Sequence, residues 1–309
     1  MSLQIILLGT AASIPTLSRS LPAVAVKRKG ELILLDCGEG TQRQMIRAKI
    51  GFNRKTKILV THMHGDHVLG LPGILQTMSL LGREKPLEVF GPPGIRSFTE
   101  AIIRTVRFTP TFQVEVYQIG DEDNVNEEED YQIHAAWANH SIQALAYALI
   151  EKPRPGKFHP ERAISLGVPK GPLWSRLQRA QEVELPDGRR IRPQDVMDAP
   201  RPGRKIVYTG DTSPSDKITE LARDADLLIH EATFADDLVE RAIEDGHSTV
   251  SQAAEAARRA GAKLLVLTHV SARYDDLKIL LEQAKKVFPN TYVAEDLMRI
   301  DIPLRKDEE

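Results

Sequence analysis

The chain has 309 residues, which is enough to bury a sizeable core in one large α/β domain or in two smaller ones. Its 41 basic and 43 acidic residues give a net charge of -2, so the overall balance predicts no general attraction to nucleic acid or to a membrane. The single cysteine, Cys37, excludes an internal disulfide and agrees with a reducing compartment, for which we expect the cytoplasm.

Apolar strand-like runs and helical patterns follow one another through the first half of the chain. The N-terminal run lacks a basic flank and is too short to span a bilayer, so it is interpreted as a first strand. Strands are predicted at residues 4–9, 23–28, 31–36, 57–60, 87–91, 112–119, 131–140 and 142–150. Helices are predicted at residues 41–48, 70–81 and 94–106. The acidic stretch 121–130 is predicted to be a turn.

The second half, after residue 205, alternates more regularly. Strands are predicted at residues 205–211, 226–232, 263–269 and 291–296. Helices are predicted after 211 and at residues 235–243, 249–260 and 275–287. Since hairpins dominate in some places and strand–helix alternation in others, the sequence favours mixed sheets covered by helices, in a four-layered α/β sandwich.

The segment at about 152–204 differs from the rest in composition. Residues 152–205 contain nine of the 19 prolines and 13 basic against six acidic residues, a local charge of +7 that leaves about -9 for the remainder. Such a composition is also typical of a solvated, partly disordered insertion. Apolar residues in "ISLGVPKGPLWSRL", including Trp174, favour a small folded, protruding basic arm.

Three histidines and an aspartate fall within the seven residues "THMHGDH" at 61–67. His62 and His64 leave a predicted strand two residues apart, so both side chains can reach one metal ion. Asp66 and His67, after the turn allowed by Gly65, can reach a second ion. The structural alternative is that Asp66 caps the following helix, which leaves three histidines unexplained.

Two ions need further ligands, and these are expected at strand ends. His140, Asp211 and His269 each end a predicted strand, although any one of them alone would more often be a turn or cap residue. Together they complete two sites, with His62, His64 and His140 on one ion, Asp66, His67 and His269 on the other, and Asp211 between them. These ligands suit zinc best, with manganese or iron as alternatives. Two such ions sharing a water predict hydrolytic chemistry.

The His-x-His-x-Asp-His pattern, followed by a later His, Asp and His, resembles the metallo-β-lactamase superfamily. Within it, the ribonuclease Z family of tRNA 3' processing endonucleases is resembled over nearly the whole chain. The motifs are "LLGTAASIP", "LLDCGEGTQRQ", "THMHGDHVLGLPG", "YTGDT", "HEATF", "HST" and "LTHVSARY". The resemblance implies one αββα hydrolase domain over 1–309 with the arm inserted, two zinc ions per subunit and no organic cofactor. It also implies cleavage of precursor tRNA that leaves a 3'-hydroxyl on the tRNA and a 5'-phosphate on the trailer.

The resemblance also implies roles for four residues beyond simple ligation. Asp66 would accept a proton from the attacking water. His247, oriented by Glu231, would stabilise the scissile phosphate and protonate the leaving 3' oxygen. Asp36 would hold a ligand histidine. From the residues alone, His247 is also explained as the residue before a helix capped by Ser248 or Thr249, and Glu231 as a strand-end carboxylate.

Substrate binding is implied at two places. In "GVPKGP", Gly171 and Pro172 stand where the family has the motif that grips the tRNA elbow, and the local charge of +7 suits phosphate contacts. In "PTLSRS", Arg19 matches a family loop that meets the tRNA 3' end, whereas Ser20 replaces an asparagine, so altered end discrimination is expected. Family enzymes of this length imply a homodimer.

Three alternatives remain open from the sequence. A small-ester or phosphodiester hydrolase of the same fold (a lactonase, arylsulfatase or thioesterase) would use the same ligands but would leave the basic arm idle. A redox diiron protein of this fold is expected to have Glu where His64 stands. A non-enzymatic RNA-binding scaffold would not need every ligand to be present.

Overall fold

The computed structural model describes residues 3–305, which separate into two compact units. The larger unit holds the described residues up to Ile150 together with Lys205–Pro303. The smaller unit holds Glu151–Arg204 with Leu304 and Arg305. Among residues 3–305, no helix is both long and apolar enough to cross a bilayer.

The first sheet of the larger unit contains, within residues 3–305, seven strands in the order β16-β1-β2-β3-β4-β5-β6. They are β1 (Leu3–Gly9), β2 (Ala23–Arg28), β3 (Glu31–Leu35), β4 (Lys55–Leu59), β5 (Leu87–Gly91), β6 (Val114–Gln118) and β16 (Arg299–Asp301). Strands β3 to β6 pair in parallel, and β16, β1, β2 and β3 pair antiparallel. Strand β3 is buried along its whole length and β4 from Thr56 onward, because both faces of the sheet are covered.

The second sheet has the same plan, again with seven strands in the described chain, in the order β15-β14-β13-β12-β9-β8-β7. They are β7 (Asp123–Glu127), β8 (Tyr131–Ala138), β9 (Ala144–Glu151), β12 (Lys205–Tyr208), β13 (Leu227–Glu231), β14 (Leu265–Thr268) and β15 (Thr291–Val293). Strands β12 to β15 are parallel, whereas β9 joins β12 antiparallel and β7 joins β8 antiparallel.

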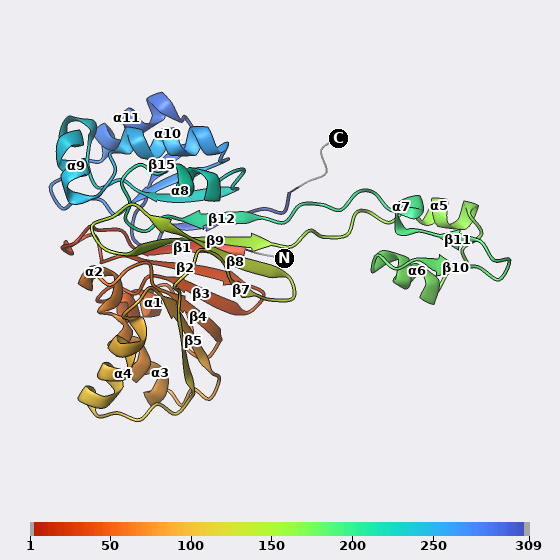
Figure 1. The fold of residues 1–309 in the computed structure, drawn as a ribbon, viewed down its shortest axis with the longest axis horizontal. Coiled ribbons are helices and arrows are strands. Elements are labelled where there is room, and N and C mark those ends of the chain that lie inside the picture. Colours follow the sequence, from red (N-terminus) through yellow and green to blue (C-terminus); the bar gives the residue numbers. More distant parts are fainter. Residues whose placement is uncertain (1–2, 306–309) are drawn as a thin grey trace. The chain divides into compact units, whose positions relative to one another are not determined.

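Helices cover the outer face of each sheet, and the two sheets face each other (Figure 1). The helices of the larger unit are α1 (Thr41–Arg47), α2 (Gly65–Val68), α3 (Leu71–Leu80), α4 (Ile95–Val106), α8 (Asp216–Leu221), η1 (Asp236–Leu238), α9 (Val239–Asp245), α10 (Val250–Ala260) and α11 (Lys278–Val287). Neighbouring residues of β4 point into different cores. Leu59 lies in the core between the sheets, and Ile58 lies in the core under α1 and α3. A third core packs β13 and β14 against α10 and α11. Three stacked cores confirm the predicted four-layered αββα sandwich.

One local prediction was wrong. The acidic stretch 121–130 is not simply a turn, because residues Asp123–Glu127 form β7 at the edge of the second sheet. An edge strand pairs on one side alone and keeps many of its side chains in solvent. Its sequence therefore need not alternate between apolar and polar residues, and the strand is not predicted from that pattern. The real turn is shorter, and Glu128 N–H donates to the Tyr131 carbonyl across it at 2.9 Å.

The smaller unit folds around its own apolar core. Its elements are α5 (Pro160–Ser165), α6 (Pro172–Gln178), β10 (Val183–Glu184), β11 (Arg190–Ile191) and α7 (Pro193–Val196). Ala163, Leu177 and Val196 are fully buried, and Trp174 packs against Phe158 with ring centroids 5.2 Å apart. Such short elements hold together because apolar side chains from each of them meet in one cluster.

Candidate metal centre

Strand ends from both sheets converge at one edge of the larger unit. The candidate ligands follow β4 and β8 or lie beyond the ends of β12 and β14. Of these strands, β4, β12 and β14 have parallel neighbours, and ligands usually bind where parallel strands end. Gly210 marks the contact between the two sheets, because its φ is +57° and a Cβ there would lie 2.7 Å from the Thr61 side chain. Only glycine allows the chain carrying Asp211 to approach the chain carrying His62 so closely.

The first group of candidate ligands is His62, His64 and His140. His64 Nδ1 lies 3.0 Å from His62 Nε2 and 3.2 Å from His140 Nε2. Ring nitrogens bound about 2.0–2.1 Å from one tetrahedral ion lie about 3.3 Å apart, so this spacing fits a shared metal. Burial, with the neighbouring His67, lowers the pKa of His62 to about 2, which keeps its imidazole neutral and able to ligate.

The second group is Asp66, His67 and His269, with Asp211 between the two groups. His67 Nε2 lies 3.4 Å from His269 Nε2, and Asp66 Oδ2 lies 3.6 and 3.5 Å from these two nitrogens. Asp211 Oδ2 is 3.4 Å from His67 Nε2, 3.3 Å from His269 Nε2 and 3.6 Å from His62 Nε2 of the first group. One oxygen thus faces both sets of imidazoles, as a bridging ligand would.

The other oxygen of Asp211 supports the same conclusion. Asp211 is buried, and within residues 3–305 its Oδ1 has no hydrogen-bond partner. A buried carboxylate oxygen without a donor is unfavourable unless a cation satisfies it. The donor set of imidazoles and carboxylates therefore fits a divalent metal centre, and every residue predicted from the sequence as a ligand lies in it.

Hydrogen bonds to neighbouring groups fix the orientation of the ligand rings. His67 Nδ1 lies 2.7 Å from Asp36 Oδ2, and His140 Nδ1 lies 2.8 Å from the Gly246 carbonyl. A carbonyl or carboxylate oxygen only accepts, so Nδ1 carries the proton in both rings and Nε2 presents its lone pair to the site. Asp36 directly follows β3 and has φ +58°, an uncommon conformation that turns its side chain toward the histidines.

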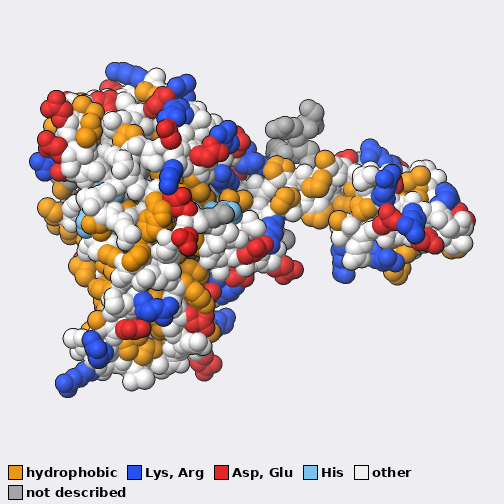
Figure 2. All heavy atoms as spheres, viewed as in Figure 1, with side chains coloured by type: hydrophobic (Ala, Val, Ile, Leu, Met, Phe, Trp, Pro, Cys, Tyr) orange, Lys and Arg blue, Asp and Glu red, His pale blue; other side chains and the backbone are white. Residues whose placement is uncertain are grey.

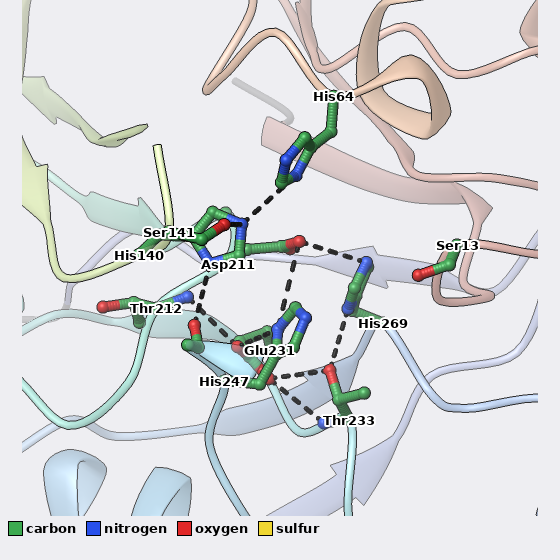
Figure 3. Close-up of polar contacts among 12 residues, drawn as sticks. Ser13, His64, His140, Ser141, Asp211, Thr212, Glu231, Thr233, His247 and His269 are labelled. Carbon is green, nitrogen blue, oxygen red and sulfur yellow. Dashed lines mark hydrogen bonds and ion pairs between the residues drawn. The ribbon is translucent and has the colours of Figure 1, made fainter. Parts of the chain in front are cut away.

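Next to the candidate ligands, His247 and Glu231 form a buried pair (Figure 3). His247 Nδ1 lies 2.8 Å from Glu231 Oε1, and the Thr212 N–H donates to the same oxygen at 3.1 Å. Burial alone would lower the pKa of His247, but the hydrogen bond and the charge of Glu231 raise it to about 9. Thr249 caps α10 by accepting from the Gln252 N–H, so within "HST" the capping role falls to Thr249 and leaves His247 free for chemistry.

Asp66 is also held by a residue that is not one of the candidate ligands. The Ser13 N–H donates to Asp66 Oδ2 at 2.9 Å. Burial would raise the pKa of Asp66, but the contact with His269 and the nearby His67 imidazole bring it well below its usual value. Asp66 is therefore an ionised carboxylate at neutral pH, able to ligate or to accept a proton.

Gly38 supports the segment that carries Asp66, and its replacement is a first test of the site. A Cβ at Gly38 would lie 2.3 Å from the Asp66 carbonyl oxygen and 2.7 Å from Leu21 Cβ, so backbone must shift. We expect Gly38→Ala to lower the free energy of unfolding by about 1–3 kcal/mol, measured by urea denaturation, and to weaken zinc binding. Gly51→Ala is the matched control, because no atom of residues 3–305 beyond its chain neighbours lies within 4 Å of a Cβ at that position. Equal stability of the two variants would contradict the close approach.

Arg19, predicted to bind substrate, lies in a loop that is tied to the fold. Its Nη1 donates to Thr10 Oγ1 at 2.6 Å and to the Ala294 carbonyl at 2.7 Å. The Ser20 N–H donates to Asp296 Oδ2 at 2.7 Å. Arg19 also lines a hollow of about 520 Å³. The loop is thus anchored by Arg19 itself, and its contact with substrate stays a prediction.

Gly171 and Pro172 open helix α6 on the surface of the smaller unit. Gly171 has φ +142°, and its Cβ position is in open space, so conformation rather than room requires glycine there. Figure 2 shows basic side chains on the visible face of this unit beside acidic ones. Most of its acidic residues pair with arginine or histidine, whereas Lys157, Lys170 and Arg179 are exposed and have no carboxylate partner among the described residues. These three cations are available to an anionic partner.

Several residues that support the site were not identified from the sequence. Thr61 and Thr233 contact ligand histidines, Tyr208 donates to Asp36 Oδ2 at 2.8 Å, and Gly246 accepts from His140. The sequence could have indicated two of them, because Thr61 and Thr233 lie within the motifs "THMHGDH" and "HEATF". Nothing in the sequence pairs Gly246 with His140.

Comparison with known proteins places this site in context. A family model described as beta-lactamase superfamily domain matches residues 195–270, and one described as anti-Pycsar protein Apyc1 matches residues 3–96. A protein named ribonuclease Z from Methanosarcina acetivorans is 50% identical over 306 residues, covering 99% of this chain and 100% of its own. A ribonuclease Z from Myxococcus xanthus is 46% identical and covers 98% and 99% of the two chains.

Solved structures show the same likeness. The short form of human tRNase Z matches with a TM-score of 0.72 and 30% identity, covering 97% of this chain and 100% of its own. The metallo-beta-lactamase fold protein YhfI from Bacillus subtilis matches with a TM-score of 0.67 at 18% identity, covering 97% and 100%, and supports the fold alone.

Proposed function

Because the chain belongs to the ribonuclease Z family of metallo-β-lactamase-fold endoribonucleases, we propose that it cuts precursor tRNA at the start of the 3' trailer. The observation that carries the proposal is that the seven candidate ligands converge in a chain related from end to end to ribonuclease Z enzymes. The products are a tRNA with a 3'-hydroxyl and a trailer with a 5'-phosphate.

The cofactor of the proposed reaction is a pair of zinc ions, and the donor set supports a divalent metal. His62, His64 and His140 would hold one ion, the group of Asp66, His67 and His269 the other, and Asp211 would contact both. When bound, such ions supply Lewis-acid chemistry that makes water a better nucleophile and offsets the negative charge of the phosphate.

Three side chains carry out the proton transfers and the positioning. Asp66, ionised and held by Ser13, accepts the proton of the attacking water. His247, whose Nδ1 is held by Glu231, turns its other nitrogen to the scissile phosphate and donates a proton to the leaving 3' oxygen. Glu231 orients His247 and favours its charged form.

In this proposal the smaller unit binds the body of the tRNA, and the positive charge of the unit supports this role. The inserted segment at about 152–204 carries an excess of positive charge, and Lys170, Gly171 and Pro172 are exposed at the start of α6. Cations without internal carboxylate partners gain the most from phosphate contacts. Arg19 and Ser20 are proposed to meet the 3' end.

We further propose that the protein is a homodimer and that it works in the cytoplasm. Exposed apolar side chains in and directly after α1 to α3, namely Ile46, Leu69, Leu80 and Leu81, support a homodimer. The free, buried Cys37 supports a reducing cytoplasm.

The test is incubation of end-labelled precursor tRNA with the purified protein, with and without a chelator. We expect one cut, a 3'-hydroxyl on the tRNA and a 5'-phosphate on the trailer, loss of cleavage on chelation and its return with added Zn²⁺. A 2',3'-cyclic phosphate would show that the RNA's own 2'-hydroxyl attacks, and cleavage that survives chelation would contradict a metal-dependent reaction.

A further inference from the structure

A threonine hydroxyl stands between a ligand histidine and a buried carboxylate in the C-terminal half of the site. Thr233 Oγ1 donates to Glu231 Oε2 at 2.9 Å and lies 2.9 Å from His269 Nδ1 (Figure 3). A carboxylate only accepts, and a hydroxyl has one hydrogen, so the hydroxyl can only accept from His269 Nδ1–H. His269 Nε2 then keeps its lone pair and faces Asp211 and Asp66.

The N-terminal half repeats this arrangement with other residues. Thr61 Oγ1 donates to the Asp36 carboxylate at 2.9 Å and lies 3.0 Å from His62 Nδ1. Asp36 also binds His67 directly, just as Glu231 binds His247 directly. Each half therefore has one carboxylate that holds one imidazole by direct contact and a second through a hydroxyl.

We propose that Thr61 and Thr233 are positioning residues whose hydroxyls fix the tautomer and ring orientation of His62 and His269 for metal binding. Both threonines are buried, with exposures of 0% and 5%, so bulk water does not readily replace a missing hydroxyl. Through Thr233, Glu231 is shared by a metal ligand and by His247, which links metal binding to the proton donor. The inference rests on the proposed function only in its last step, the effect on RNA cleavage.

Valine is the informative replacement because it keeps the shape of threonine and removes only the hydroxyl. The backbone N–H of Thr233 also donates to Glu231 Oε2, at 3.1 Å, and that of Thr61 to Asp36 Oδ1, at 2.7 Å. Both bonds survive in the valine variants, so the carboxylates stay held while the ring nitrogens lose their acceptor. Serine restores the hydroxyl with less volume.

The experiment measures Zn²⁺ affinity by competition with a chromogenic chelator in Thr233→Val, Thr233→Ser and Thr61→Val. We expect the valine variants to bind zinc about 10–100-fold more weakly and the serine variant to recover most of the loss. Thr268→Val is the matched control, because it removes the hydroxyl of another buried threonine, the residue directly before His269 at the end of β14. Thermal unfolding of the metal-free proteins reports on the fold separately.

Cleavage of precursor tRNA at saturating zinc is the second measurement. We expect Thr233→Val to lower kcat and to leave KM within about threefold, since the hydroxyl is buried and binds Glu231 and His269. Zinc affinity equal to wild type in both valine variants, or Thr233→Ser as impaired as Thr233→Val, would overturn the proposal. If zinc affinity falls as expected while the wild-type protein leaves precursor tRNA uncut, the positioning role stands and the substrate assignment fails.

Discussion

Replacing His247 with asparagine is expected to lower kcat for precursor tRNA cleavage by about 10²–10⁴-fold, the usual contribution of a positioned general acid. Asparagine keeps a donor near Glu231 Oε1 but carries no transferable proton. The zinc content of the protein, measured by atomic spectroscopy, should stay at the wild-type value. Steady-state kinetics at saturating zinc gives kcat separately from KM.

The zinc measurement distinguishes the two roles that geometry allows for His247. Its ring lies within reach of Asp211 and His269, so it is also a candidate ligand. Its Nδ1 is already committed to Glu231 at 2.8 Å and lies 4.0 Å from Asp211 Oδ2, which favours the proton donor. A variant that loses zinc together with activity would show that His247 is a ligand instead. Glu231→Gln is the companion variant, for which a smaller loss of kcat is expected because the imidazole keeps a hydrogen-bond acceptor.

The candidate ligands could be identified from the sequence because strand ends are easy to find and parallel strands end at one edge of a sheet. Three histidines in seven residues, at 61–67, have no ordinary structural explanation. His140, Asp211 and His269 then follow from the requirement of two ions for further ligands. The structure brings all of these side chains together.

The residues that orient the ligands could not be identified in the same way. Whether Thr233 bonds His269 depends on side-chain rotamers and on the direction of one hydroxyl hydrogen, neither of which leaves a periodic pattern. Gly246 meets His140 only through a contact between distant loops. The edge strand β7 was missed for a related reason, since its many polar side chains follow neither a helical nor an alternating pattern.

Removal of residues 153–202 is expected to lower kcat/KM for precursor tRNA by about 10²-fold or more, while hydrolysis of a small phosphodiester continues. The flanking strands β9 and β12 are antiparallel neighbours, with Lys205 opposite Ile150, and the Glu151 N–H donates to the Arg204 carbonyl at 2.9 Å. Joining Lys152 to Gly203 therefore leaves a two-residue hairpin loop that ends in glycine, a favoured connection.

A milder variant separates the effect of losing positive charge from the effect of losing the folded unit. Replacing Lys157, Lys170 and Arg179 with alanine keeps the core of the smaller unit, because all three side chains are exposed and lie outside that core. The slope of log Kd for tRNA against log salt concentration should fall by about one for each phosphate that the variant no longer neutralises. If the deletion and the alanine variant both cleave precursor tRNA like wild type, the smaller unit has no part in substrate binding. Loss of small-phosphodiester hydrolysis in the deletion variant would instead mean that removing the segment damages the metal centre, and the alanine variant would then decide the question alone.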